Sequence, residues 1–107
     1  MHTDGDATDW RQVLALYDQL LSLVPTPIVA LNRAVALAEV EGPAAALAAV
    51  DELEIPGYHL LPATRADLLT RLGRPDEARV AYDEALALAG NDTERAFLHD
   101  RRAGLAS

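Results

Sequence analysis

Residues 73–86 read GRPDEARVAYDEAL, and the fold of the whole chain can be worked out from this stretch. Pro75 suits the first position of an α-helix, where the missing backbone N–H has no helical partner to lose. Ala78, Tyr82 and Ala85 follow at spacings of four and three, which places them on one face of that helix. The small alanine side chains let a neighbouring helix approach closely. We therefore expect an amphipathic helix that packs tightly against another helix.

The same pattern occurs 32 residues earlier in the chain. This shift aligns Arg33-Ala34 with Arg65-Ala66, Leu37 with Leu69, Pro43 with Pro75, Ala46 with Ala78, Ala49 with Ala81, and Asp51-Glu52 with Asp83-Glu84. A period of this size is typical of helix pairs stacked into a solenoid. Residues 17–25 also match residues 82–90, so the first helix has the pattern of a second helix whose partner is missing. We expect the chain to be the C-terminal part of a longer polypeptide.

Prolines, glycines and capping residues divide the chain into helical segments. We expect helices over residues 10–24, 27–41, 43–53, 58–72, 75–89 and 91–105, and Asn91 with Glu94 forms a capping box. No segment alternates as a β-strand does, so the predicted fold class is all-α, a short α-solenoid of about six helices in TPR-like (tetratricopeptide-like) antiparallel pairs. Residues 1–8 are expected to be a disordered lead-in. Residues 9–107 then form one domain, made of an unpaired second helix (9–24), two repeats (27–53 and 58–89) and a capping helix (91–105).

The composition excludes several classes of protein. There are 17 acidic and 9 basic side chains in 107 residues, for a formal charge of −8, so the chain as a whole repels a phosphate backbone and direct nucleic-acid binding is not expected. There is no cysteine, hence no disulfide framework and no thiolate metal site. No apolar run reaches the roughly 20 residues of a membrane span, and no signal-peptide pattern occurs. We expect a cytoplasmic location and no membrane contact.

The sequence gives no support for catalysis. His59 and His99 lie on different predicted helices without a paired ligand spacing, and each is better explained by packing or solvent exposure than by a site. Ser22 and Ser107 lie in no nucleophile turn. Adjacent carboxylates such as Asp51-Glu52 point about 100° apart on a helix and cannot flank one substrate atom. We predict no enzyme activity and no catalytic, cofactor or metal site.

Two arginines recur at the same repeat position, Arg33 and Arg65, and each precedes an alanine. One interpretation is that each guanidinium pairs with one of the repeated helix acids, Asp18, Asp51 and Asp83, and fixes one helix pair against the next. The alternative is a solvent-facing arginine that contributes less than about 1 kcal/mol. The sequence leaves both open.

Trp10 is the single tryptophan and stands at the start of the first predicted helix. It either covers apolar surface left by the missing partner helix or anchors an upstream domain or a binding partner. The same missing helix would leave apolar surface around Trp10, Leu14 and Tyr17. A homodimer of the isolated chain is therefore possible through this surface.

Gly73-Arg74-Pro75-Asp76-Glu77-Ala78, followed by Tyr82, Ala85 and Leu86, resembles a tetratricopeptide (TPR) repeat. The chain departs from that family at Pro62, Arg65 and Gly90, where tryptophan, leucine and proline are usual. The resemblance implies peptide-facing positions on the first helices of the pairs, and these are Ile28, Leu31, Val35, Leu60, Ala63, Asp67 and Arg71. The asparagine and lysine set of carboxylate-clamp TPRs is absent, which disfavours a C-terminal carboxylate as the ligand.

A wider pattern combines TDW (8–10), LYD (16–18), PIVALNRAVA (27–36), EGPAA (41–45), GYHLLPATRADLL (57–69) and RLGR (71–74). It resembles the TPR-like C-terminal extension of a group of bacterial extracytoplasmic-function (ECF) sigma factors. The resemblance implies a regulatory role in transcription initiation through contacts with RNA polymerase core, the sigma domains or another regulator. The alternative is a stand-alone TPR adaptor or scaffold, unrelated to transcription, whose acidic concave face binds a basic peptide.

Overall fold

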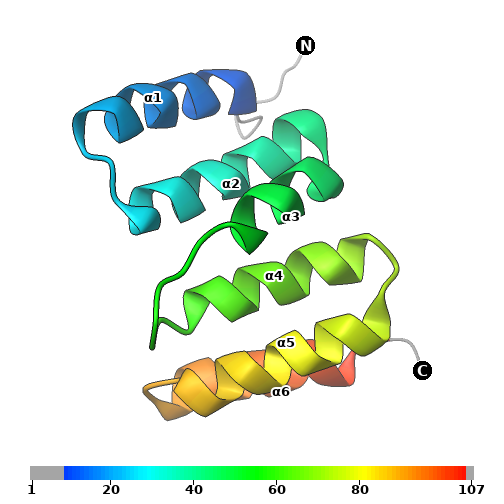
Figure 1. Cartoon of the computed structure of the whole chain (residues 1–107). Coiled ribbons are helices and arrows are strands. Elements are labelled where there is room, and N and C mark those ends of the chain that lie inside the picture. Colours follow the sequence, from blue (N-terminus) through cyan, green and yellow to red (C-terminus); the bar gives the residue numbers. More distant parts are fainter. Residues whose placement is uncertain (1–8, 106–107) are drawn as a thin grey trace.

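The computed structural model describes residues 9–105, and all of its regular elements are α-helices (Figure 1). The helices are α1 (Trp10–Leu23), α2 (Pro27–Glu41), α3 (Pro43–Asp51), α4 (Leu60–Arg71), α5 (Pro75–Leu88) and α6 (Asp92–Ala103). The predicted all-α class and the number of helices are confirmed. The expected disordered lead-in, residues 1–8, lies outside the described residues. None of the helices between residues 9 and 105 combines the length and hydropathy needed to cross a membrane.

Side chains fix the starts of three helices. Asp9 Oδ1 accepts a hydrogen bond from the Gln12 amide at 3.3 Å, and Thr26 Oγ1 accepts one from the Val29 amide at 3.2 Å. At α6, Asn91 Oδ1 accepts from the Glu94 amide at 2.8 Å. Glu94 Oε1 in turn accepts from the backbone N–H of Gly90 at 2.9 Å, one residue before the usual position of a capping box.

Three predicted boundaries differ from the structure by two residues: the end of α3, the start of α4, and the end of α6, which is Ala103 and not residue 105. The connection between α3 and α4 explains the first two. Predicted to continue to residue 53, α3 ends at Asp51, because the Leu53 amide bonds to the carbonyl of Val50 in a tighter turn, at 3.0 Å. Predicted to begin at residue 58, α4 begins at Leu60. Pro62 has no N–H to donate to the Tyr58 carbonyl, which accepts instead from the Leu61 amide at 3.2 Å in a tighter turn, and the regular helical bonds begin with the His59 carbonyl.

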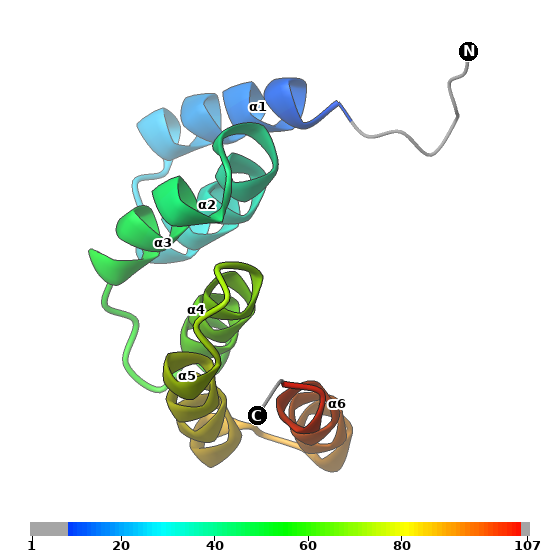
Figure 2. The same cartoon turned by 90° about the vertical axis from the view of Figure 1, so that its right-hand side faces the viewer.

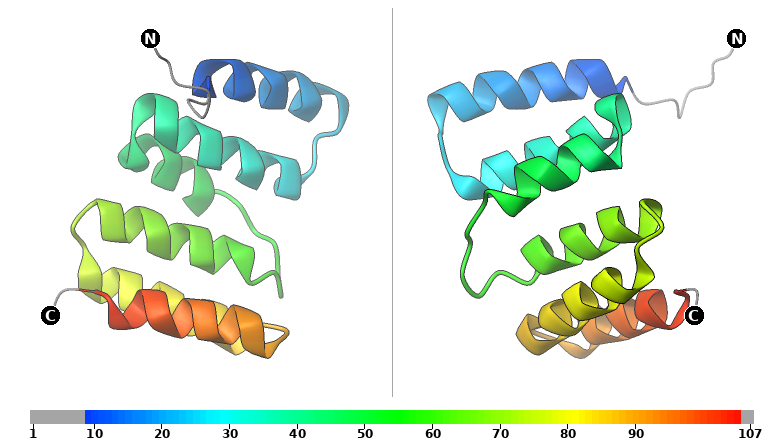
Figure 3. Two further views of the ribbon diagram at one scale, coloured as in Figure 1. Left: turned by 180° about the vertical axis from the view of Figure 1, so that it is seen from behind. Right: turned by 45° about the vertical axis from the view of Figure 1, so that its right-hand side comes forward.

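The helices stack in chain order into a short solenoid, with α2–α3 and α4–α5 as the two complete pairs. Each helix packs chiefly on the one before it and the one after it. Figure 2 shows an arc whose inner side is lined by α2, α4 and α6, while α3 and α5 lie on the outer side. The views in Figure 3 agree that α1 and α6 close opposite ends of the stack. The arc thus brings three first helices, far apart in sequence, onto one surface.

Alanine dominates the points where the helices cross. Five alanines of the core are completely buried, and these are Ala34, Ala46, Ala66, Ala78 and Ala85. Leucine, valine and tyrosine side chains, with Leu68 and Val50 the largest that are fully enclosed, fill the remaining space. No polar or charged side chain of residues 9–105 is buried. The repeat positions that align in the sequence are therefore the contacts that hold the pairs together.

The first helix is the least enclosed part of the stack, because α1 has no buried residue and packs chiefly on α2. The sequence predicted free apolar surface around Trp10, Leu14 and Tyr17, and this placement is wrong. All three are half-buried on one side of α1. The exposed apolar side chains of α1 are instead on its other side, and they are Leu16, Leu20 and Leu23.

The turn after α4 allows a test of whether the left-handed backbone at Gly73 requires glycine. Gly73 has a φ of +73°, and the Arg74 amide bonds to the Leu69 carbonyl at 3.0 Å in a Schellman motif. Gly73→Ala places a Cβ on this left-handed backbone, so we expect the free energy of unfolding to fall by about 1 kcal/mol. Gly104, at a φ of −79°, supplies the control. Gly104→Ala should change the free energy by less than about 0.5 kcal/mol in the same urea titration, and equal effects of the two substitutions would contradict this account.

Candidate functional site

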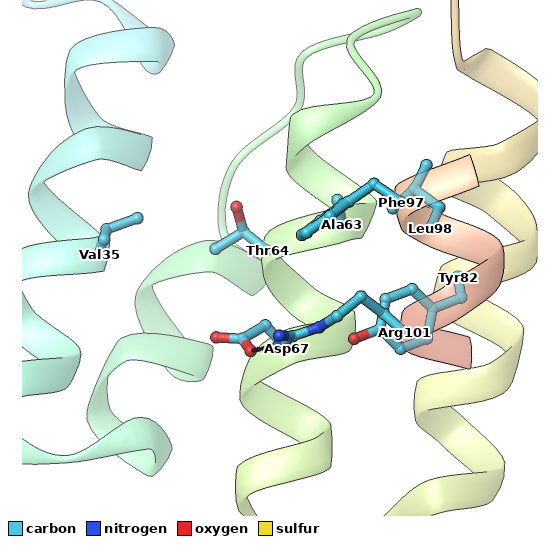
Figure 4. A pocket seen from close by; sticks show the side chains of 8 residues that line it. All are labelled: Val35, Ala63, Thr64, Asp67, Tyr82, Phe97, Leu98 and Arg101. Atoms are coloured by element: carbon cyan, nitrogen blue, oxygen red, sulfur yellow. Dashed lines mark hydrogen bonds and ion pairs between the residues drawn. The ribbon is translucent and has the colours of Figure 1, made fainter. Parts of the chain in front are cut away.

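The inner side of the arc carries a groove between α4 and α6, with Val35 of α2 on its far side (Figure 4). One part is a hollow of about 220 Å³, lined by Val35, Ala63, Thr64, Asp67, Tyr82, Phe97, Leu98 and Arg101. A second part of about 420 Å³ is lined by His59, Leu60, Ala63, Thr93, Glu94, Phe97 and Leu98. The two hollows share Ala63, Phe97 and Leu98, so they are continuous. We call them together the inner groove.

The part of the inner groove near the starts of α4 and α6 is apolar. Leu60 in the first turn of α4 and Phe97 in the second turn of α6 are both exposed. Across the groove, Val35 of α2 is exposed as well (Figure 4). Large apolar side chains gathered in one hollow are typical of a surface that binds another protein, because a partner removes them from water.

Asp67 and Arg101, at the other end of the inner groove, belong to a chain of ion pairs that crosses three helices and extends beyond the groove. Glu39 Oε2 of α2 lies 2.9 Å from Arg71 Nη1 of α4, and Arg71 Nε lies 3.2 Å from Asp67 Oδ2 on the same helix. Asp67 Oδ1 then accepts a hydrogen bond from Arg101 Nη2 of α6 at 2.8 Å (Figure 4). Two carboxylates and two guanidiniums alternate, so the chain carries no net charge.

Arg101 joins the ionic end of the groove to its apolar end. Its guanidinium carbon lies 5.7 Å from the centre of the Phe97 ring, within the range of a cation–π contact. A hydrogen bond with the Tyr82 side chain raises the pKa of Arg101, desolvation opposes this effect, and the negative charge of Asp67 adds to it. The arginine therefore stays charged, and its position is fixed from three directions.

The structure brings most of the predicted peptide-facing residues onto the inner side. Leu60, Ala63 and Val35 line the inner groove, and Asp67 and Arg71 belong to its ion-pair chain. The exposed Ile28 lies in the first turn of α2.

Four of the eight predicted partner-binding residues do not line the inner groove, and these are Trp10, Ile28, Leu31 and Arg71. Leu31 is buried in the core cluster, so its prediction as a peptide contact is wrong. Three residues beyond Ile28, its side chain turns into the stack and away from the inner surface. Trp10 is half-buried on α1, at the far end of the stack from α6.

Sequence reasoning missed Phe97 and Glu39, and it noted Arg101 only as one of several basic residues on the last helix, without its partner. Glu39 and Arg71 are separated by 32 residues, the repeat period, so opposite charges at one repeat position were a readable signal for their contact. Phe97 occupies the third position of the series that begins with Arg33 and Arg65. The sequence offered no comparable signal for Arg101, whose contact with Asp67 depends on how α6 closes the stack.

A second set of ion pairs joins each second helix to the first helix that follows it. The guanidinium of Arg33 on α2 bonds to Asp18 on α1, and Arg65 Nε on α4 donates to Asp51 Oδ1 on α3 at 2.9 Å. Both arginines thus contact acids of the predicted set. The third acid, Asp83 on α5, accepts from Arg102 Nε on α6 at 2.8 Å, a partner that the sequence did not indicate.

The acidic excess lies away from the inner groove. Glu52, Glu54 and Glu84 have no ion-pair partner within residues 9–105 and are exposed. Glu54 and Glu84 lie at a different hollow of about 300 Å³, between the α3–α4 connection and α5. The inner groove is not the predicted acidic concave face, because Asp67 and Glu94 are the only carboxylates among its lining residues and Asp67 is paired with Arg71 and Arg101.

Few other side chains of the described residues could take part in acid–base chemistry or bind a metal. His59 Nε2 lies 3.5 Å from Glu94 Oε2, at the edge of the inner groove, and its ring contacts that of Tyr58 edge-on at 6.0 Å between centroids. Across the part of the chain that the structure describes, no three side chains of histidine, cysteine, aspartate or glutamate gather as a metal site would require.

Comparison with known proteins gives one informative relative. No protein-family model and no solved structure matches the chain. An uncharacterized protein of Rhizobium meliloti (strain 1021) is 47% identical over 95 residues, which cover 87% of this chain and 22% of the relative. The chain thus spans about a fifth of the length of this curated relative. The segment recurs inside a much longer polypeptide.

The pair of Asp51 and Arg65 permits a direct test of the inter-repeat contacts. Asp51→Ala, Arg65→Ala and the double variant form a double-mutant cycle that separates the ion pair from the packing of the arginine stem. Because both side chains are partly exposed, we expect a coupling energy of about 0.5 kcal/mol that shrinks in 1 M salt. Glu52→Ala, which removes a neighbouring acid without a partner, should show no coupling with Arg65→Ala. A coupling of zero between Asp51 and Arg65 would leave Arg65 as a solvent-facing side chain.

Proposed function

We propose that this domain is a protein-interaction module and that its partner binds in the inner groove. The observation that carries the proposal is the exposed ring of Phe97, which lies beside Leu60 and Ala63 in a hollow between α4 and α6. An aromatic anchor in a concave apolar site is the usual centre of a protein-binding surface. No chemical step is assigned to the site.

The two ends of the inner groove define the partner's chemistry. The apolar end accepts an aliphatic or aromatic side chain against Phe97. The ion-pair chain from Glu39 to Arg101 presents both donors and acceptors without net charge, so it suits the backbone or polar side chains of the same segment. A short segment with an apolar anchor at one end and polar groups at the other is therefore the favoured ligand.

We further propose that this binding serves transcription initiation, as the C-terminal module of a cytoplasmic protein that resembles ECF sigma factors. The support is the sequence resemblance, which extends over nearly the whole chain from residue 8 to residue 105. The partner would be RNA polymerase core, the sigma domains or a regulator. Promoter DNA is a poor ligand for this surface, since Arg71 and Arg101 are already engaged by carboxylates.

A stand-alone adaptor for a basic peptide is the second candidate. It is favoured by one observation, the carboxylates of Glu54 and Glu84 that lack ion-pair partners at the hollow beside α5. That hollow lies on a different side of α4 from the inner groove. The two candidates therefore predict sensitivity to different substitutions.

Purified bacterial core RNA polymerase and the isolated sigma domains are the binding partners to test against the immobilised chain. We expect Phe97→Ala to weaken capture by about tenfold or more, because loss of a central aromatic anchor costs at least about 1.4 kcal/mol. Val80→Ala is the matched control, as it truncates an apolar side chain of α5 that is equally exposed but lines neither hollow of the inner groove.

Three outcomes distinguish the candidates. Loss with Phe97→Ala alone supports the inner groove. Capture that is weakened by Glu54→Gln and Glu84→Gln, and is unaffected by Phe97→Ala, supports the basic-peptide adaptor. No binding to polymerase or sigma domains at micromolar concentrations would contradict the role in transcription.

A further inference from the structure

Helix α1 can be compared with α5 residue by residue, because the two helices share one register. Residues 17–25 match residues 82–90, a shift of 65 positions. With the same shift, Trp10 matches Pro75, and each is the first residue of its helix. Position by position, α1 and α5 are therefore equivalent second helices of their pairs.

Burial differs sharply at three equivalent positions. In α5 and just beyond it, Ala81, Ala85 and Ala89 are 2%, 0% and 5% exposed. Their equivalents are Leu16, Leu20 and Val24, which are 58%, 40% and 44% exposed. The three are spaced by four residues, so they form one stripe along α1. We call these three residues the α1 stripe.

The neighbours of the two helices explain the difference. Helix α5 packs on α4, the first helix of its own pair, and on α6, the first helix that follows. Helix α1 has α2 as the first helix that follows, but no described helix takes the place of α4. The α1 stripe is thus the apolar face that the first helix of the pair would cover. Leu23 does not belong to it, because its equivalent, Leu88, is exposed as well.

We propose that the α1 stripe is the docking surface for one α-helix, which lies antiparallel to α1 as α4 lies against α5. The helix must be amphipathic. Its inner face must be apolar, as the buried face of α4 is.

This helix comes from the remainder of a longer chain, and two observations argue for that source. The matched segment makes up 22% of the Rhizobium meliloti relative, so this domain occurs in polypeptides with ample chain to supply a helix. A second copy is the weaker candidate, because the 14 residues of α1 span only about 21 Å and offer far less than the roughly 800 Å² per partner of a stable dimer. A covalently attached helix needs no such area, since its docking is intramolecular.

The internal repeats provide the probe for the test. Residues 60–74, which are α4 and its connection to α5, can be joined directly to Trp10 in place of residues 1–9, in the register that the two helices share. A second graft uses residues 27–42, the other first helix with its connection, in case the first graft does not dock. The chain has no cysteine, so Leu20→Cys reports the α1 stripe and Ser22→Cys, exposed on the same helix, is the control.

The measurement is the rate of thiol labelling by a water-soluble maleimide. In the 107-residue chain we expect both cysteines to react at similar rates and the chain to sediment as a monomer. In at least one graft, labelling at position 20 should slow by about tenfold or more while labelling at position 22 stays unchanged. Equal rates at the two positions in both grafts would overturn the proposal. Slow labelling at position 20 in the 107-residue chain, together with the mass of a dimer, would also overturn it and make a second copy the occupant.

Discussion

The close approach of helices at alanine contacts is the constraint on which the rest of this structure depends. Ala34 and Ala46 of the first complete pair, and Ala66 and Ala78 of the second, stand at equivalent positions and are fully buried. A larger side chain there would push the backbones apart. Because the same contact recurs with the repeat period, successive pairs stack with similar geometry, and α2, α4 and α6 come to line one inner surface (Figure 2).

Ion pairs complement these contacts without replacing them. Each of three junctions joins an acid of a second helix to an arginine of the next first helix, as Asp51 joins Arg65. The side chains are partly exposed, so each pair contributes little to the free energy of unfolding. Across the inner surface, Glu39, Arg71, Asp67 and Arg101 add a second line of pairs between first helices.

Local patterns made most of the fold predictable. Proline and glycine marked the helix ends, and Pro75 is the first residue of α5 as the sequence indicated. The errors fall where local rules compete. Tyr58 has helix-forming neighbours, yet Pro62 has no N–H for its carbonyl, so α4 starts two residues later than predicted. Leu31 was placed on the partner surface by analogy, although its neighbour Ile28 is the one that the helix turns outward.

The site was only partly predictable, for a different physical reason. Arg33 and Arg65 repeat together with their acids, so their pairing followed from the period. The last helix breaks the period, since position 97 carries phenylalanine and the arginines that reach Asp67 and Asp83 stand later on α6. How a capping helix closes a stack depends on its packing against α5, which no pattern within α6 encodes. No pattern in the sequence therefore predicted that Phe97 lies in the inner groove.

One measurement tests the central claim, that small side chains at the helix crossings determine the stacking. It compares the free energy of unfolding in urea for Ala66→Leu and Ala85→Leu with that of Ala87→Leu, which adds the same volume at an exposed position of α5. The account predicts a loss of about 1–3 kcal/mol for each buried substitution and less than about 0.5 kcal/mol for the exposed one. Buried leucines that leave stability unchanged would contradict it.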